Sequence, residues 1–162
     1  MDHKFAAQLY TLREEIKEGF HPLFKTLKEM GWAGVQISAL PKNYDQHEVA
    51  LALKENNLQA AGMHISLDRL TNDLEGVLKE ADLYGTKDII LPSIPKDLHH
   101  AEGFKEIKNR LNQIKKKAPE YRISYHNHAF EFDIEIEGQD GLRYLLDPAN
   151  DNHILAEIDV YW

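Results

Sequence analysis

The sequence contains no cysteine, which excludes disulfide bonds, cysteine-rich zinc sites and a cysteine nucleophile. It has no apolar stretch near the ~20 residues of a membrane-spanning helix, and no signal-peptide core follows Met1. Basic residues number 19 against 27 acidic ones, and the net charge of −8 disfavours nucleic acid, whose phosphates need clustered Lys and Arg. These absences predict a cytoplasmic protein that binds neither membranes nor nucleic acid.

Two hydrophobic patterns alternate along the 162 residues. Short apolar runs predict strands that are buried on both faces of a sheet. Between them, apolar residues recur at helical spacing and stop at Gly, Asn or Pro, which are the expected helix stop signals. The predicted strands are 5–9, 35–37, 60–65, 88–91, 123–125 and 154–160, and the predicted helical stripes are 20–30, 49–53, 74–81, 104–114 and 142–146.

Strict alternation of strands and helices predicts a parallel sheet covered by helices. Two architectures fit, an open doubly wound sheet and a (β/α)8 barrel. The Gly-rich phosphate loop of nucleotide-binding folds is missing after the first strand, where residues 8–13 read QLYTLR. A closed barrel needs eight strands and ~250 residues, and six strands are predicted. The sixth would leave an open edge, so association into a homo-oligomer through this edge is one hypothesis.

Local signals refine two connections. Thr71-Asn72-Asp73 supplies side-chain acceptors and is expected to cap the helix that follows. His99 and His100 follow two prolines in a loop, and we expect both histidines to be exposed to solvent.

Polar residues gather at the end of the fifth predicted strand, where parallel α/β proteins carry their functional groups. His126 and His128 are two residues apart and leave an extended strand on the same face. Neutral imidazoles bind divalent metals, and Glu131 adds a carboxylate within reach. Tyr125 and Asn127 add hydroxyl and amide groups suited to a polyol. The alternative is that one histidine is packed and hydrogen-bonded behind the site.

Other strand ends supply further candidates. Asp159 lies within an apolar strand, where a carboxylate is costly unless it is paired or bound to a metal; we predict a ligand, with a structural ion pair as the alternative. His64 is either a substrate contact or a satisfied core histidine. Tyr10 and Trp162 are predicted to form a wall on which a sugar stacks, or else to be buried in the core. Glu157 belongs to the same strand end as Asp159.

At these residues the sequence resembles the xylose-isomerase-like TIM barrels of sugar phosphate isomerases and epimerases. The resemblance covers essentially the whole chain and implies a single partial (β/α)8 TIM-barrel domain over residues 1–162. The matching segments are QLYTLR at 8–13, GWAGVQ at 31–36, HISL at 64–67, YHNHAFEF at 125–132 and EIDVYW at 157–162, and the last two are the most specific.

The resemblance implies a divalent metal, with manganese expected ahead of magnesium, cobalt or zinc. In the epimerases the ligands are Glu, Asp, His and Glu on strands five to eight. Asp159 matches the strand-six ligand, whereas Tyr125 stands where the strand-five Glu is expected. His126 or His128 is the replacement suggested by the inosose dehydratases, which this chain also resembles. The strand-seven and strand-eight ligands are not among the 162 residues.

The implied activity is isomerisation or epimerisation of a keto-sugar through proton transfer next to a carbonyl, with Glu131 as one acid/base group. An inosose-type dehydration of a keto-polyol is the alternative within the same family. An AP-endonuclease-like DNA repair enzyme on the same fold and a non-enzymatic half-barrel are the others. With half of the metal ligands missing, we expect the 162-residue chain to be inactive by itself.

Overall fold

The computed structural model describes residues 5–162. It divides into two compact units, one formed by the chain up to His64 with Glu75–Asp88, the other by Ile65–Leu74 with Ile89–Trp162. The six main strands follow one another in the sheet in the order β1-β2-β3-β4-β5-β8. All six predicted strands and all five predicted helices are found, so the alternation read from the sequence is confirmed. No helix among the described residues is long and apolar enough to span a membrane.

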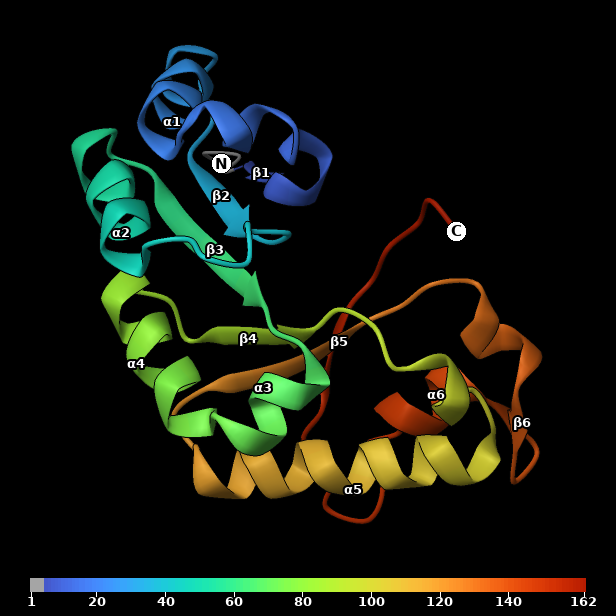
Figure 1. The fold of residues 1–162 in the computed structure, drawn as a ribbon. Helices are drawn as coiled ribbons and strands as arrows, with labels where there is room; N and C mark the ends of the chain where they lie inside the picture. Colours follow the sequence, from blue (N-terminus) through green and yellow to red (C-terminus); the bar gives the residue numbers. More distant parts are fainter. Residues whose placement is uncertain (1–4) are drawn as a thin grey trace. The chain divides into compact units, whose positions relative to one another are not determined.

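The first unit is built on three parallel strands, β1 (Ala6–Gln8), β2 (Gly34–Ile37) and β3 (Gln59–His64). Two 3-10 turns, η1 (Leu9–Leu12) and η2 (Glu15–Glu18), follow β1. Helices α1 (Phe20–Glu29) and α2 (Gln46–Glu55) pack together on the same side of β2 and β3 (Figure 1). The Asp45 side chain begins α2 by accepting a hydrogen bond from the His47 amide at 2.8 Å. Their apolar stripes form a core with the strands: Phe24, Leu27, Val35, Val49 and Leu53 are buried.

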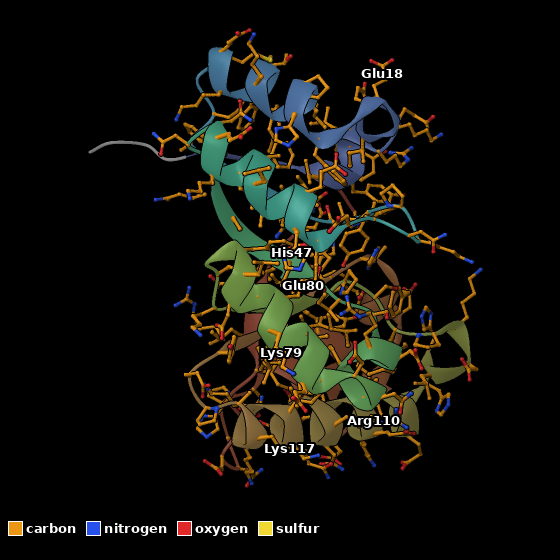
Figure 2. The ribbon with its side chains drawn as sticks, turned by 60° about the vertical axis from the view of Figure 1, so that its left-hand side comes forward. Glu18, His47, Lys79, Glu80, Arg110 and Lys117 are labelled. Carbon is orange, nitrogen blue, oxygen red and sulfur yellow. The ribbon has the colours of Figure 1, made fainter. Side chains whose placement is uncertain are left out.

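Helix α4 (Leu74–Tyr84) carries a buried acid in the first unit. Glu80 is 2% exposed and accepts a hydrogen bond from the Tyr44 hydroxyl, whereas its neighbour Lys79 is exposed and pairs with Glu75 at 2.6 Å (Figure 2). Tyr84 is also buried, and burial raises its pKa, with the Glu80 carboxylate adding to the effect. The Glu80 side chain of α4 is thus part of the packed interior of the first unit.

In the second unit, β5 (Arg122–His126) and β8 (Leu155–Glu157) form a parallel pair, and β4 (Asp88–Leu91) lies where the two units divide. Helix α5 (Ala101–Lys117) packs along β5 (Figure 1). Its predicted apolar stripe is confirmed, since Phe104, Ile107 and Leu111 are fully buried. The remaining elements are α3 (Leu67–Asn72), η3 (Lys96–Leu98), η4 (Phe130–Asp133), the antiparallel pair β6 (Glu135–Ile136) and β7 (Gln139–Asp140), and α6 (Gly141–Leu146).

Two local expectations were wrong in part. Thr71 and Asn72 do not cap α4, because they belong to α3 and their side chains bond back to the Leu67 carbonyl and the Asp68 carboxylate, both at 2.8 Å. Of the two adjacent histidines, only His100 is exposed. His99 is half-buried, because its ring stacks on Phe130 with centroids 3.7 Å apart.

The sixth strand is shorter than predicted. It ends at Glu157, because its partner β5 ends at His126, which lies opposite Glu157 in the sheet. Asp159 is therefore not inside a strand but two residues past its end, where its side chain is 26% exposed. Val160, which was predicted to be part of the strand, is 91% exposed.

Candidate metal and polyol site

The predicted site residues fall into the two units. In the first unit, Tyr10 lies in η1 with its ring exposed, and its amide donates to Ser38 Oγ at 2.9 Å. His64 is the half-buried last residue of β3. The second unit brings the other predicted residues together at the ends of β5 and β8: Tyr125, His126, Asn127, His128, Glu131, Asp159 and Trp162.

His126 lies between two carboxylates. Its Nδ1 is 2.8 Å from Glu157 Oε1, and its Nε2 is 3.3 Å from Asp159 Oδ2. The side chain is 10% exposed, so the ring has little access to water. Each nitrogen of the imidazole thus faces a negatively charged oxygen.

A neutral imidazole does not satisfy this arrangement by itself. When Nδ1–H donates to Glu157, the lone pair of Nε2 points at the acceptor Asp159, and two acceptors face each other. Either a second proton on His126 or a cation between Nε2 and Asp159 removes the conflict. Nitrogen and carboxylate donors such as His126 Nε2 and Asp159 Oδ2 suit divalent transition metals.

The separation of 3.3 Å between His126 Nε2 and Asp159 Oδ2 also fits a shared ion, because two ligands each bound at ~2.1 Å lie at about this distance. Glu157 would then orient His126 from behind, the usual relation of a carboxylate to a ligating histidine. The donors present in the second unit therefore fit a divalent metal, with His126 and Asp159 as ligands and Glu157 holding the ring.

Asn127 fixes the backbone of Asp159. Its side-chain oxygen accepts from the Asp159 amide at 2.9 Å, and its side-chain nitrogen donates to the Asp159 carbonyl at 3.1 Å. The carboxamide thus pairs with Asp159 as a peptide group of a neighbouring strand would. Because Asn127 is 2% exposed, this pair is shielded from water. Its predicted contact with substrate stays a prediction, since both ends of the carboxamide are engaged here.

Glu131 is fully buried, at 0% exposure. Its Oε1 accepts from the Tyr125 hydroxyl at 2.6 Å and its Oε2 from the His128 amide at 2.9 Å. Burial raises the pKa of Tyr125, and its hydrogen bond to Glu131 adds to the effect, so Tyr125 is a neutral donor. The acid/base role predicted for Glu131 stays a prediction, because the carboxylate is fully buried and both of these contacts are with protein donors.

The His128 ring lies between His126 and Trp162, with centroids 5.3 Å and 5.2 Å away. Burial lowers the pKa of His128, so the imidazole is neutral at neutral pH. Its Nδ1 is buried without a hydrogen-bond partner, 3.8 Å from Glu131 Oε1. The structure places the His128 ring beside His126, one of the candidate ligands.

Sequence reasoning named Glu157 only as part of a strand end and did not select it. The signal was present, because Glu157 and Asp159 are two residues apart, the same spacing that drew attention to His126 and His128. What the sequence lacks is the pairing of β5 with β8, which sets Glu157 opposite His126.

No protein-family model matches the sequence. No curated protein matches it either. Solved structures do: a sugar phosphate isomerase/epimerase from Parabacteroides distasonis superposes with a TM-score of 0.78 at 16% identity, over 98% of this chain and 68% of that one. An AP endonuclease, family 2, from Brucella melitensis gives 0.70 at 16% identity, over 98% and 69%. The 3-keto-D-glucoside 4-epimerase of E. coli, in its apo form, gives 0.55 at 20% identity, over 89% and 64%.

A xylose isomerase-like TIM barrel fused to a 4-hydroxyphenylpyruvate dioxygenase also matches, with a TM-score of 0.57 at 15% identity over 82% of this chain and 23% of that one. At such identities the likeness concerns the fold. It decides between the two architectures left open by the pattern of strands and helices, in favour of the barrel.

Proposed function

From the fold of an incomplete xylose-isomerase-like TIM barrel, we propose that this chain carries part of the active site of a metal-dependent isomerase or epimerase acting on a keto-sugar or keto-polyol. The observation that supports the proposal is the position of His126 between Glu157 and Asp159 at the ends of β5 and β8. Of the four neighbours reported above, one is a sugar phosphate isomerase/epimerase and another a 3-keto-D-glucoside 4-epimerase.

In this proposal His126 and Asp159 hold a divalent metal, with manganese as the first candidate, and Glu157 keeps the imidazole oriented. Such a metal, when bound, polarises a carbonyl and a neighbouring hydroxyl and makes the proton next to the carbonyl more acidic. His128 and Asn127 border the ligands. Glu131 accepts a hydrogen bond from the His128 amide, which fixes the backbone next to the proposed ligands.

Metal binding by the purified 162-residue chain tests the proposal. Manganese binding can be measured by the electron paramagnetic resonance of the free ion. The affinity should fall at least ~10- to 100-fold in His126→Gln, because that range is typical even for the loss of a residue that only orients a ligand. His153→Gln is the matched control, because His153 is an exposed histidine that faces one carboxylate, Asp151, at 2.7 Å. Equal affinity in both variants would remove the support for a metal site at His126.

Turnover tests the reaction class and its limits. With the ligands that the resemblance puts on strands seven and eight not among these residues, we expect no manganese-dependent exchange of solvent deuterium into a keto-sugar by this chain alone. Robust exchange or isomerisation would contradict that expectation. The neighbouring AP endonuclease fold makes abasic DNA a necessary comparison; with a net charge of −8, we expect neither binding nor cleavage of an abasic duplex.

A further inference from the structure

A polar hollow lies in the second unit between α5 and residues 137–151. Its volume is about 390 Å³, which is within the range of sites that hold small ligands. Helix α5 forms one wall, and the β6–β7 turn, α6 and the loop after α6 form the others; α6 itself packs on α5 (Figure 1). None of the residues that line this polar hollow belongs to the candidate metal and polyol site.

The walls of the polar hollow are held in place by buried hydrogen bonds. Asn112 of α5 donates to Asn152 Oδ1 at 2.7 Å, and its own Oδ1 accepts from the His153 amide at 3.0 Å. Asn152 is 7% exposed and donates to the carbonyls of Leu145 and Asp147. These bonds tie the loop after α6 to α5, so the hollow is formed before any ligand arrives.

Four of the five carboxamides that line the polar hollow make no side-chain hydrogen bond within residues 5–162. They belong to Asn109, Gln113, Gln139 and Asn150. A carboxamide has donors and an acceptor side by side, so it pairs with a group that has the same, such as a peptide group. The pair that Asn127 forms with the Asp159 backbone, at 2.9 Å and 3.1 Å, is an example within this chain.

The spacing along α5 matches that of an extended peptide. Asn109 and Gln113 are four residues apart, a rise of ~6 Å along the helix. An extended chain presents the amide and carbonyl of every second residue on the same edge, at intervals of ~6.7 Å. A saccharide fits less well, because Tyr144 is the one aromatic residue of the lining and Lys108 Nζ lies over its ring, 4.5 Å from the centroid.

The charges in the polar hollow favour a basic ligand over an anion. Both lysines of the lining are engaged: Lys108 Nζ donates to the Tyr144 carbonyl at 2.6 Å, and Lys116 Nζ is 3.8 Å from Asp151. Asp147 is half-buried and accepts from the Ala149 amide at 2.9 Å, and its carboxylate makes no ion pair within residues 5–162. An ammonium or guanidinium group of a ligand would supply the missing countercharge.

A second, apolar hollow adjoins the first and shares Gln139 and Asp147 with it. Its volume is about 380 Å³, and Leu142 and Leu146 of α6 supply its apolar lining. A ligand that passes over Asp147 therefore leaves hydrogen-bonding side chains and meets apolar ones. This order suits a chain whose side chains differ in character along its length.

We propose that the two hollows together bind an extended peptide segment of another protein, in which a basic residue lies next to an apolar one. The peptide backbone pairs with the carboxamides of Asn109 and Gln113. The basic side chain meets Asp147, and the apolar side chain lies against Leu142 and Leu146. The inference does not depend on the function proposed above.

An NMR titration of the ¹⁵N-labelled 162-residue chain with acetyl-Thr-Leu-Lys-Leu-Thr-amide tests the proposal. A leucine stands on each side of the lysine, so the probe can bind in either direction. We expect saturable shifts of the side-chain NH₂ signals of Asn109 and Gln113. Affinity should fall about fivefold in Asn109→Ala or Gln113→Ala, the equivalent of one hydrogen bond. Gln46→Ala is the matched control, because Gln46 is an exposed carboxamide of α2 in the first unit.

Two further comparisons test the backbone and the charge separately. A probe whose leucine amides are N-methylated should bind more weakly, since it lacks those donors. Asp147→Asn should weaken binding of the lysine probe and leave unchanged the binding of a probe with glutamine in place of lysine.

Absence of saturable shifts at millimolar probe would overturn the inference. Equal binding of the N-methylated probe, equal losses in Gln46→Ala and the two α5 variants, or tighter binding of cellotetraose than of the peptide would also overturn it.

Discussion

Removing the Asn127 carboxamide should weaken the fold and the metal site together. Asn127→Ala removes both bonds to the Asp159 backbone, at 2.9 Å and 3.1 Å, and a third to the His128 carbonyl at 3.3 Å. A buried hydrogen bond contributes about 1 kcal/mol net, and the side chain is 2% exposed. Since Asp159 is half-buried and regains part of the loss from water, we expect the free energy of unfolding to fall by about 2 kcal/mol.

The same change should release Asp159 from its position beside His126. We expect manganese affinity to fall about tenfold, the lower end of what the loss of a positioning partner costs a metal site. Urea denaturation followed by circular dichroism measures the stability, and electron paramagnetic resonance of free manganese measures the affinity.

Asn152→Ala is the matched control. Asn152 is also buried, and its side-chain nitrogen donates to the Leu145 carbonyl at 2.9 Å and the Asp147 carbonyl at 2.7 Å. It should lose similar stability and keep its manganese affinity. The reasoning fails when Asn127→Ala leaves manganese affinity unchanged, or when both variants lower it equally.

Three further outcomes are expected. Burial raises the pKa of Tyr125, so the contribution of its neutral hydroxyl to stability is complete below the unfolded pKa near 10 and is lost as the pH rises further, by up to about 1.4 kcal/mol per pH unit. In urea titrations of Tyr125→Phe, the free energy of unfolding should therefore decline less steeply above pH 10. Burial lowers the pKa of His128, so stability should fall as pH drops below about 6.5, and an unchanged acid slope in His128→Gln would contradict this. Gly141→Ala should cost about 1–3 kcal/mol in thermal unfolding, because its Cβ would lie 2.8 Å from the Phe104 ring and 2.9 Å from the Glu131 carbonyl; wild-type stability would show that these neighbours yield freely.

The strands and long helices could be predicted from the sequence, because burial of one face or both produces a regular spacing of apolar residues. The apolar stripe of α5 is an example, since the spacing predicts that Phe104, Ile107 and Leu111 are buried, as the structure has them. The apolar spacing of helix α3 is a weaker signal. Its six residues are capped by Ser66, and Thr71, which the pattern assigned to a following cap, bonds back inside α3.

The site was predicted in its residue types but not in their relations. Two-residue spacing brought His126 and His128 to attention, yet spacing does not show which ring meets which carboxylate. The pairing of ring and carboxylate depends on β8 lying beside β5, which places Glu157 next to Nδ1 of His126 and Asp159 next to Nε2. The bond between Tyr125 and Glu131 is also tertiary, made across the turn after β5.

The peptide-like pair between Asn127 and Asp159 also bears on how β8 finds its place. Successive strand residues point to opposite faces and are ~3.3 Å apart, so a slip of one residue would turn Asp159 away from His126. β8 is three residues long, and so short a strand resists slipping weakly. The Asn127 carboxamide accepts a hydrogen bond from the Asp159 amide and donates one to the Asp159 carbonyl. A slipped β8 could make the same pair with Ile158 or Val160 only by breaking its backbone hydrogen bonds to β5. The Asn127 side chain thus fixes the register of β8 against β5. The alignment of these two strands and the position of the Asp159 carboxylate therefore depend on the same carboxamide.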